Sequence, residues 1–281
     1  MRMSALRQYN TQVIVSGNVG EKYVYENPVA RGFARRRQGG RARALFTSQE
    51  IKDDNRKKVA SRARARVRRM ANANPQLNKF LTLTYAENKT DISACRYDFD
   101  KFVKRMKTRY SDFQYICVIE FQKRGAVHFH LLCNLPYVNV NELAMNVWKQ
   151  GFIKLNRIDN VDNVGAYVTK YMTKEGMDDR LIGKKCYTMS KGLNEPVTLT
   201  DEEEIELLEE SLEGVKRIHS AEFVSDYYGT ITYTQVVCSA PVPVKRKKKG
   251  LFDRLARFLP GKTLSAVFPG LGIGKPVQMR I

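Results

Sequence analysis

The middle of the chain alternates between the hydrophobic periods of strand and helix, and this alternation limits the fold more than any other feature. Four short runs rich in bulky or β-branched side chains predict strands at residues 80–85, 114–121, 126–133 and 151–158. Apolar side chains at helical spacing predict helices at residues 95–106, 141–148 and 164–174. The element order βαββαβα, over about 95 residues, therefore predicts an α+β domain.

This element order is typical of one kind of sheet. In a ferredoxin-like βαββαβ arrangement, the strands form an antiparallel sheet and the helices cover it. The first predicted helix has the apolar face that such packing needs, made by Cys95, Phe99, Phe102, Val103 and Met106. We therefore expect a ferredoxin-like antiparallel sheet, with its helices on one face, in a domain of residues 76–195.

Basic residues flank this domain. The chain has 49 Lys and Arg against 29 Asp and Glu, a net charge of +20, and residues 31–69 alone hold fifteen of the cations. A protein this basic usually has an anionic partner, most often nucleic acid. The charge therefore favours a nucleic-acid-binding function over a role in solubility alone.

The N-terminal region, residues 1–75, is predicted to be a basic arm followed by a helix. Glycines and arginines without an apolar period make residues 31–40 a flexible arm. A capping-box pattern, Thr47 followed by Glu50, starts a helix predicted over residues 48–72. Because this helix has almost no apolar stripe, we expect it to be solvated or to lie along phosphates.

Two further regions follow the central domain. Residues 196–240 are predicted to hold an acidic amphipathic helix at 201–213 and two short strands within 223–237. Residues 241–281 carry prolines and a run of cations at 245–249. We expect this last region to be a disordered basic tail.

Several protein classes are disfavoured by what the sequence lacks. No run of about 18 apolar residues is present, so no membrane span is expected, and residues 1–20 lack the apolar segment of a secretory signal. The five cysteines are scattered without a CxxC pair, which favours a reducing cytoplasm over a disulfide framework or a zinc site. The phosphate-binding pattern GxxxxGK[ST] of a helicase domain is also missing.

The strand at 126–133 carries two of the three histidines of the chain. His128 and His130 are two residues apart, so both imidazoles point to one face of the strand. Val127, Phe129 and Leu131 point the other way, toward the expected core. Two neutral imidazoles side by side are a metal-ligand pattern. The alternative is a pair of half-exposed strand histidines.

One acid is within reach of this pair. Glu120 is on the preceding strand, at a position where the pattern predicts an apolar side chain, and a turn near Gly125 brings it toward the histidines. With His128 and His130 it would form a three-ligand site for Mg²⁺ or Mn²⁺, acting as a Lewis acid on a phosphate oxygen. Taken alone, Glu120 would more often be a surface residue of a strand.

The helix at 164–174 carries two tyrosines and two lysines at helical spacing. Tyr167 and Tyr171 are four residues apart on one face, and Lys170 and Lys174 are on an adjoining face. Tyrosines on helices usually pack in the core, which is the first interpretation of this pattern. The second is a nucleophilic phenol with a nearby cation that lowers its pKa or holds a phosphate.

Three segments together resemble the ordered motifs of a known family. They are FLTLTY at 80–85, EFQKRGAVHFH at 120–130 and YVTKY at 167–171. Their order is similar to that of HUH endonucleases, and more narrowly to the rolling-circle replication initiators (Rep proteins) of bacteriophages and plasmids. The resemblance covers roughly residues 78–192 and includes a downstream segment, 187–193, similar to one in phage initiators.

The resemblance implies an activity and partners. Such initiators nick single-stranded origin DNA by metal-assisted attack of a tyrosine, which leaves a 5′-phosphotyrosyl intermediate and a free 3′-hydroxyl primer, and they later rejoin the strand. The implied partners are origin DNA, folded as a hairpin, and a host polymerase in a bacterial cytoplasm. Because the helicase pattern is missing, unwinding would fall to a host helicase.

The resemblance also assigns roles to residues. The histidine pair and Glu120 would bind the metal, Tyr167 would be the nucleophile, and Lys170 would orient the phosphate. Tyr171 matches the second tyrosine of phage-type initiators, and whether it is catalytic or packs in the core stays open. The residues expected to hold DNA phosphates are Arg35, Arg36, Arg37, Arg62, Arg64, Arg66 and Lys174.

Other functions are alternatives to this one. Relaxases and single-tyrosine transposases share the metal and tyrosine chemistry, but relaxases usually place the tyrosine before the histidines, and the transposases lack a long basic arm. In a non-catalytic basic nucleic-acid-binding protein, the histidines and tyrosines would be ordinary residues of the sheet and helix.

Overall fold

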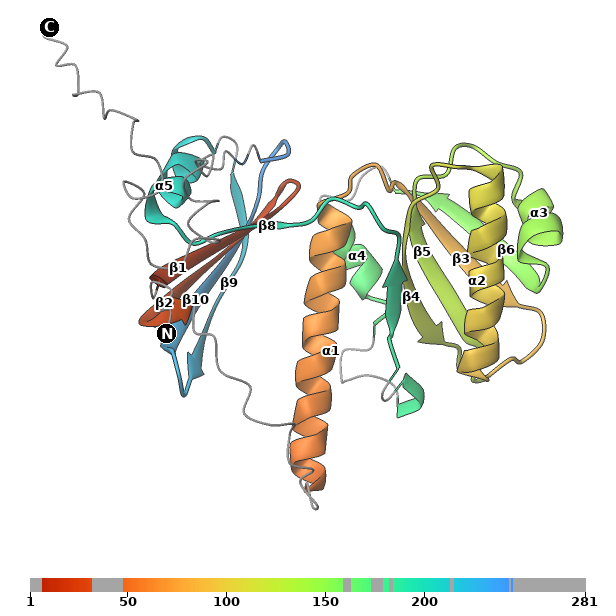
Figure 1. Ribbon diagram of the computed structural model, residues 1–281, viewed down its shortest axis with the longest axis horizontal. Coiled ribbons are helices and arrows are strands. Elements are labelled where there is room, and N and C mark those ends of the chain that lie inside the picture. The colour runs from red at the N-terminus through yellow and green to blue at the C-terminus, as the bar shows by residue number, and fades with distance from the viewer. Residues whose placement is uncertain are drawn as a thin grey trace, which may run out of the picture.

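The computed structural model describes residues 7–31, 48–158, 163–172, 179–181, 184–212, 215–242 and 244. These residues form two five-stranded antiparallel sheets with helices between and around them, so the predicted α+β class is confirmed (Figure 1). No helix in these ranges is long and apolar enough to cross a membrane.

The central sheet contains the four predicted strands and one more. Its strands are β3 (Lys79–Tyr85), β4 (Tyr115–Phe121), β5 (Val127–Cys133), β6 (Gly151–Arg157) and β7 (Tyr187–Met189). They pair in the order β6-β3-β5-β4-β7, with every neighbouring pair antiparallel. The fifth strand, β7, was not predicted, because its three residues are too few for a period to be visible.

The helices of this region lie where the apolar spacing predicts them. They are α2 (Ile92–Arg109), α3 (Val140–Leu143), the π-helical turn Ala144–Trp148 that continues α3, α4 (Val164–Thr169) and a 3₁₀ turn at Asp179–Leu181. On α2, the predicted apolar face is buried, with Val103 only partly covered. Helix α4 ends earlier than predicted, and Thr173 and Lys174 are outside the described residues.

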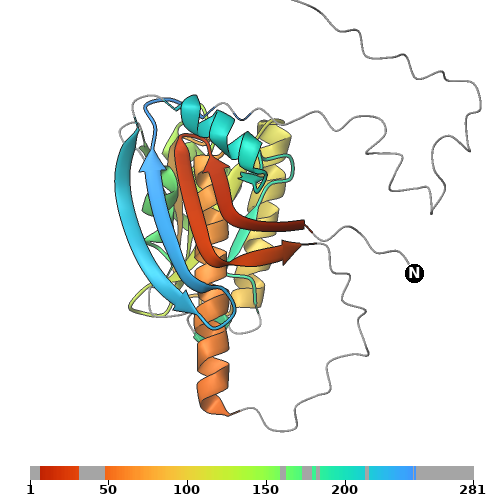
Figure 2. The same cartoon turned by 90° about the vertical axis from the view of Figure 1, so that its left-hand side faces the viewer.

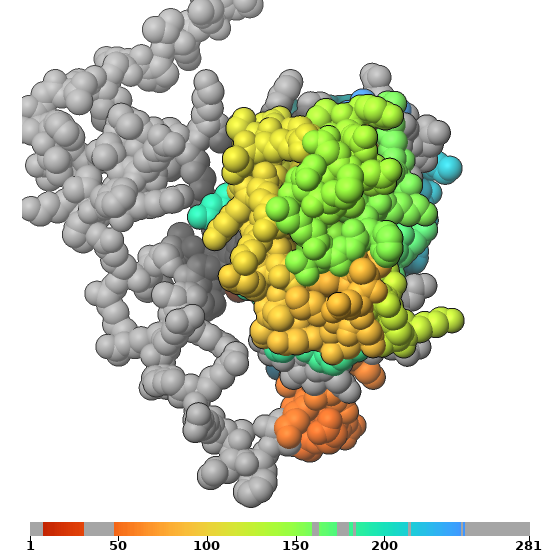
Figure 3. All heavy atoms as spheres, turned by 90° about the vertical axis from the view of Figure 1, so that its right-hand side faces the viewer, coloured from red at the N-terminus to blue at the C-terminus, as the bar shows by residue number. Residues whose placement is uncertain are grey.

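The expectation that the helices pack on one face of this sheet is wrong. On one side, the Phe129 ring packs 4.8 Å from Phe99 of α2, and Figure 3 shows α2 (yellow) and the residues around α3 (green) covering that side. On the other side, the Phe80 ring lies 5.1 and 5.2 Å from the two tyrosines of the α4 segment. Because Phe80 and Leu81, on opposite faces of β3, are both apolar, both faces need cover.

The Arg-rich helix α1 (Gln49–Asn72) forms as predicted, but it is not simply solvated. Its C-terminal half buries an apolar stripe of Ala60, Val67, Met70 and Ala71. Its N-terminal end is exposed and projects below the sheets (Figure 1). The cap is Ser48, whose hydroxyl accepts from the Ile51 N–H at 3.4 Å, and the predicted cap, Thr47, is outside the described residues.

The second sheet is the main difference from the sequence-based expectation. Its strands are β1 (Arg7–Ser16), β2 (Val19–Arg31), β8 (Val197–Leu199), β9 (Lys216–Ser225) and β10 (Gly229–Val237), in the order β8-β1-β2-β10-β9 (Figure 2). Residues 7–31, assigned to the basic arm, are therefore a hairpin in a sheet. The two strands predicted within 223–237 are confirmed, although β9 begins earlier, and residues 32–47 and 245–281 are outside the described ranges.

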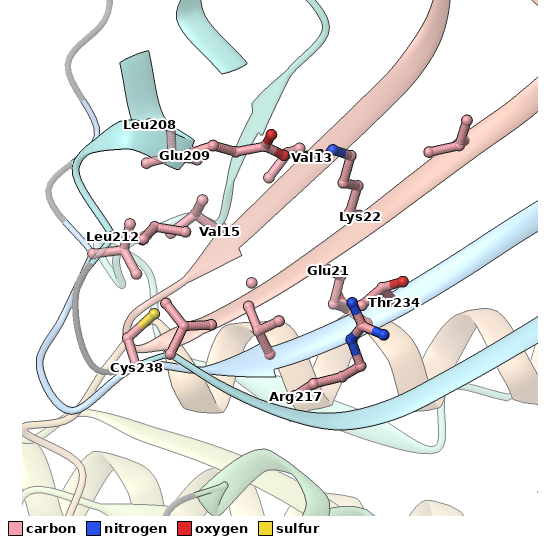
Figure 4. Close-up of a pocket in the computed structure, with 15 residues that line it drawn as sticks. Val13, Val15, Glu21, Lys22, Leu208, Glu209, Leu212, Arg217, Thr234 and Cys238 are labelled. Carbon is pink, nitrogen blue, oxygen red and sulfur yellow. Dashed lines mark hydrogen bonds and ion pairs between the residues drawn. The ribbon is translucent and has the colours of Figure 1, made fainter. Parts of the chain in front are cut away.

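The predicted acidic helix covers one face of this second sheet. It is α5 (Glu202–Glu210), and its Ile205 and Leu208 are buried together with Val13 and Val15 of β1. Between α5 and the sheet is a hollow of about 570 Å³, with apolar walls and a Lys22–Glu209 ion pair of 2.6 Å at its edge (Figure 4). The amphipathic pattern therefore predicts this helix and its buried face.

Helix α1 joins the two sheets. The buried carboxylate of Glu21 on β2 accepts from Arg68 at 2.6 Å and from Arg69 at 2.5 Å, both on α1. The Tyr233 hydroxyl of β10 donates to the same carboxylate at 2.9 Å. One residue thus binds the second sheet to the helix that also packs on the central sheet.

Candidate metal and tyrosine site

The β4–β5 hairpin brings together the three predicted metal ligands. Glu120 is directly opposite His128 in the strand pairing, and His130 is two residues further along β5. The potential ligand atoms of Glu120, His128 and His130 all lie within 4.8 Å of one another. The turn closes where Gly125, at φ 93°, donates its N–H to the Gln122 carbonyl at 2.8 Å.

His130 is held at both ring nitrogens. Its Nε2–H donates to Oε2 of Glu120 at 2.6 Å, and Nδ1 lies 3.1 Å from the Thr82 hydroxyl. Thr82 is opposite His130 on the neighbouring strand β3. If Nε2 gave its lone pair to a cation, the proton would move to Nδ1, where the Thr82 oxygen can accept it. Sequence analysis missed Thr82, although the alternation of bulky and hydroxyl residues at 80–85 was a visible signal.

His128 has a different environment. Its Nε2 atom is buried and has no hydrogen-bond partner among the described residues. Burial lowers the pKa of the imidazole, and the neighbouring His130 lowers it further, so the ring is neutral at pH 7. A buried polar atom without a partner is rare. Two imidazole nitrogens and one carboxylate oxygen, one of these nitrogens unsatisfied, fit a divalent cation.

Both predicted tyrosines lie on the same face of the sheet as this cluster. The Tyr171 ring stacks on the His130 ring, with 4.0 Å between centroids. Tyr167 packs edge-on against Phe80, and its ring is 6.1 Å from that of Tyr171. Burial, together with a hydrogen bond to Tyr167, raises the pKa of Tyr171 to about 12. Each tyrosine is half-buried against the core and adjacent to the candidate metal ligands or to the other phenol.

Lys170 is at the C-terminal end of α4. Its side chain is exposed, and Nζ lies 5.4 Å from the centroid of the Tyr167 ring. The ammonium is therefore close to this phenol, as the spacing predicts. Lys174, the other predicted cation of this segment, is outside the described residues.

Three residues that sequence analysis missed hold α4 in place. Oδ1 of Asn72, the last residue of α1, accepts from the Gly165 N–H at 2.7 Å, and its amide donates to Asn163 at 3.0 Å. Asn163 caps α4 by accepting from the Ala166 N–H at 2.9 Å. A Cβ atom on Gly165 would be only 2.2 Å from the carbonyl oxygen of Arg68. An Asn before a helix and a Gly within it were recognisable signals, but nothing in the sequence marks Asn72.

The predicted phosphate-binding residues fall into two groups. Arg62, Arg64 and Arg66 are on α1, and two of them, Arg62 and Arg66, line a hollow between α1 and β7. Arg64 is not among the described residues that line it. The other predicted cations, Arg35, Arg36 and Arg37, are outside the described ranges.

Comparison with known proteins places this site in context. Residues 78–176 match a family of replication-associated proteins, the ORF2 family. The matched segment runs from β3 to the tyrosines and includes every candidate metal ligand. No curated protein and no solved structure matches the chain. The match indicates a replication-associated role that involves DNA.

Proposed function

We propose that this protein initiates replication by nicking single-stranded origin DNA with a tyrosine nucleophile. The observation that carries the proposal is the position of two phenols beside a Glu–His–His cluster, on one sheet face, within the segment that matches a replication-associated family. The strand order β6-β3-β5-β4, with helical connections after β3 and β5, supports a ferredoxin-like HUH arrangement for this segment.

Glu120, His128 and His130 would hold Mg²⁺ or Mn²⁺. A bound divalent cation supplies Lewis-acid polarisation of a phosphate oxygen. The chain itself supplies the ligand geometry, because the hairpin pairing and the Thr82 contact fix the rings before any cation arrives.

Tyr167 is the nucleophile in this proposal. Its phenol oxygen attacks the scissile phosphorus and loses its proton, a new phosphotyrosyl bond forms, and the phosphorus–O3′ bond breaks to release a protonated 3′-hydroxyl. Lys170 stabilises the developing phenoxide or the phosphate, since its Nζ is near this ring. In the rejoining step, a 3′-hydroxyl attacks the phosphotyrosine and the phenol regains a proton.

Tyr171 would be the second phenol. Its ring is stacked on His130 and is 6.1 Å from that of Tyr167, so it is placed to accept the strand in a second transfer. A host polymerase would extend the released 3′-hydroxyl, and a host helicase would open the duplex.

The test is formation of a covalent adduct. The full chain is incubated with single-stranded oligonucleotides from its own replicon, with Mn²⁺ or with EDTA, and separated on denaturing gels. We expect a metal-dependent protein–DNA adduct that disappears in Tyr167→Phe. The matched control is Tyr137→Phe, since the Tyr137 side chain is fully exposed and outside the site.

The other outcomes are equally informative. An adduct that survives in Tyr167→Phe and is lost in Tyr171→Phe would exchange the roles of the two tyrosines. Tight binding without an adduct on any oligonucleotide would contradict the nickase and favour a non-catalytic nucleic-acid-binding protein.

A further inference from the structure

A hollow of about 770 Å³ lies between α1 and the edge strand β7. Its charged walls are Arg62 and Arg66 from α1 and Lys184 and Lys185 from the segment before β7. Tyr187 on β7 contributes an aromatic wall. We call this hollow the basic groove.

The basic groove is electrostatically one-sided. None of the described residues that line it is acidic. The nearest acid bound to it is Glu195, which pairs with Arg66 at 2.6 Å, with 62% of the glutamate side chain and 42% of the arginine side chain exposed. Exposed pairs contribute little to stability, so a phosphate can take the place of Glu195 on Arg66. The groove therefore fits an anion better than any other ligand.

The basic groove opens on the sheet face that carries the candidate site. Tyr187 is opposite Val118 on β4, and Val118 is opposite His130 on β5. Residues directly opposite each other on neighbouring strands point to the same face. Two strand spacings separate Tyr187 from His130, which is about 10 Å. A strand leaving the metal ligands toward β7 would thus enter the groove.

We propose that the basic groove binds the backbone of single-stranded DNA that extends from the scissile phosphate. The four cations hold its phosphates, and Tyr187 stacks on an unpaired base. Cations that follow the backbone combined with an aromatic wall are the recognition mode of single strands, and stacking on Tyr187 requires an unpaired base. The direction of the strand toward the site rests on the proposed nickase function, whereas binding in the groove does not.

The first experiment measures the salt dependence of binding. The full chain is titrated onto a labelled oligo-dT of about 20 nucleotides in EDTA, by fluorescence anisotropy at several salt concentrations. Removing two phosphate contacts in Lys184→Ala/Lys185→Ala should reduce the slope of log K against log salt by about 1.4 and weaken binding roughly tenfold at 0.1 M salt. Glu195→Gln should act in the opposite sense and tighten binding, because it frees Arg66.

The charge-matched control is Lys104→Ala/Lys107→Ala. These lysines are exposed on α2, which covers the opposite face of the central sheet. The same net charge is removed, so an effect of net charge alone would appear equally in both pairs. Equal loss in the two pairs would overturn the groove. Binding of a duplex competitor as tight as that of the single strand would overturn the single-strand assignment.

Adduct formation separates this proposal from the proposed function. At saturating oligonucleotide, Lys184→Ala/Lys185→Ala should form the adduct at the wild-type rate, with only the half-saturating concentration increased. If the wild type forms no adduct but the groove pair still loses the salt slope relative to the α2 pair, the groove stands and the nickase fails. If the adduct forms and the groove pair binds like the wild type, the nickase stands and the groove fails.

Discussion

At the scale of single residues, the two histidines of the cluster are held unequally. His130 has a partner at each ring nitrogen, whereas the buried Nε2 of His128 has none among the described residues. Thr82 is therefore a positioning residue that acts through His130. His128 has no hydrogen bond at Nε2 to lose, and its replacement should affect metal binding more than folding.

The first prediction concerns the affinity for Mn²⁺, measured by electron paramagnetic resonance on the full chain. Thr82→Val removes the hydroxyl that orients His130 and should weaken Mn²⁺ binding about tenfold, the usual loss for a residue that holds a metal ligand. His128→Ala should abolish specific binding while the protein stays folded by circular dichroism.

Thr84→Val is the control for Thr82→Val. Thr84 is two residues along the same strand and opposite His128, yet no hydrogen bond joins its side chain to an imidazole in the described part of the chain. The two variants remove the same hydroxyl from the same face. A comparable loss of Mn²⁺ affinity in both would contradict a positioning role for Thr82.

The candidate ligands could be predicted from the sequence because strand geometry alone relates them. The two-residue spacing of His128 and His130 fixes their common face, and a short turn fixes Glu120 opposite them. Thr82 and Asn72 act through partners on other elements, 48 and 91 residues away along the chain. Such contacts depend on strand order and helix docking, which local periodicity does not encode.

At the scale of elements, the orientation of the tyrosines depends on how α4 docks on α1. Helix α4 has six residues, too few to be stable on its own. Asn72 binds its first turn, and Gly165 allows the backbone of α1 to approach closely. The end of the Arg-rich helix thereby sets the position of the candidate nucleophile.

The second prediction is that Gly165→Ala destabilises the protein, although alanine is the better helix former. The added methyl group would meet the Arg68 carbonyl at 2.2 Å, so α4 must move. We expect a loss of about 1–3 kcal/mol in the free energy of unfolding, measured in urea, and a slower rate of adduct formation.

Asn72→Ala gives an independent check of the same docking. It removes both hydrogen bonds to α4 without adding volume, and Asn72→Asp keeps the acceptor for the Gly165 N–H. Adduct formation should fall most in the alanine variant. Wild-type stability in Gly165→Ala and wild-type activity in Asn72→Ala would together show that α4 does not depend on α1.

Sequence periodicity located the elements of the central sheet but not the side on which α4 packs. The period of a helix shows that one face is apolar, not which face of a sheet it covers. Phe80 in the strand pattern was the available signal, because it alternates with residues that face α2.

At the scale of the whole molecule, the two sheets are joined through α1 and Glu21. Burial raises the pKa of the Glu21 carboxyl, but Arg69 and Arg68 outweigh burial and the pKa is lowered overall. A lowered pKa stabilises the folded state above the ordinary glutamate pKa of 4.5. This stabilisation is lost as the pH falls through the lowered pKa of the folded protein.

The third prediction is therefore a pH-dependent stability that Glu21 controls. Unfolding in urea should show a loss of stability below about pH 4.5 in the wild type. Glu21→Gln should be less stable by about 2 kcal/mol at pH 7 and should lose less on acidification. Its control is Glu142→Gln, which removes an exposed ion pair with Arg109 and should change stability little. Parallel pH profiles of Glu21→Gln and the wild type would contradict the assignment.

The second sheet could not be predicted because its pairings are remote. Val13 of β1 pairs with Leu199, and Tyr23 of β2 pairs with Tyr233. The basic composition that follows residue 31 also drew the whole N-terminal region into one arm. The strand signals of β9 and β10 were recognised, but their partners lie near the other end of the chain.

This pairing of distant segments has a consequence for synthesis on the ribosome. The nascent chain carries β1 and β2 long before β10 emerges, whereas all strands of the central sheet lie between residues 79 and 189. The central sheet can therefore complete its hydrogen bonding first, while the free edge of β2 waits for residues 229–237. Translation that stops after residue 189 would release the reactive domain with an unpaired, aggregation-prone hairpin attached.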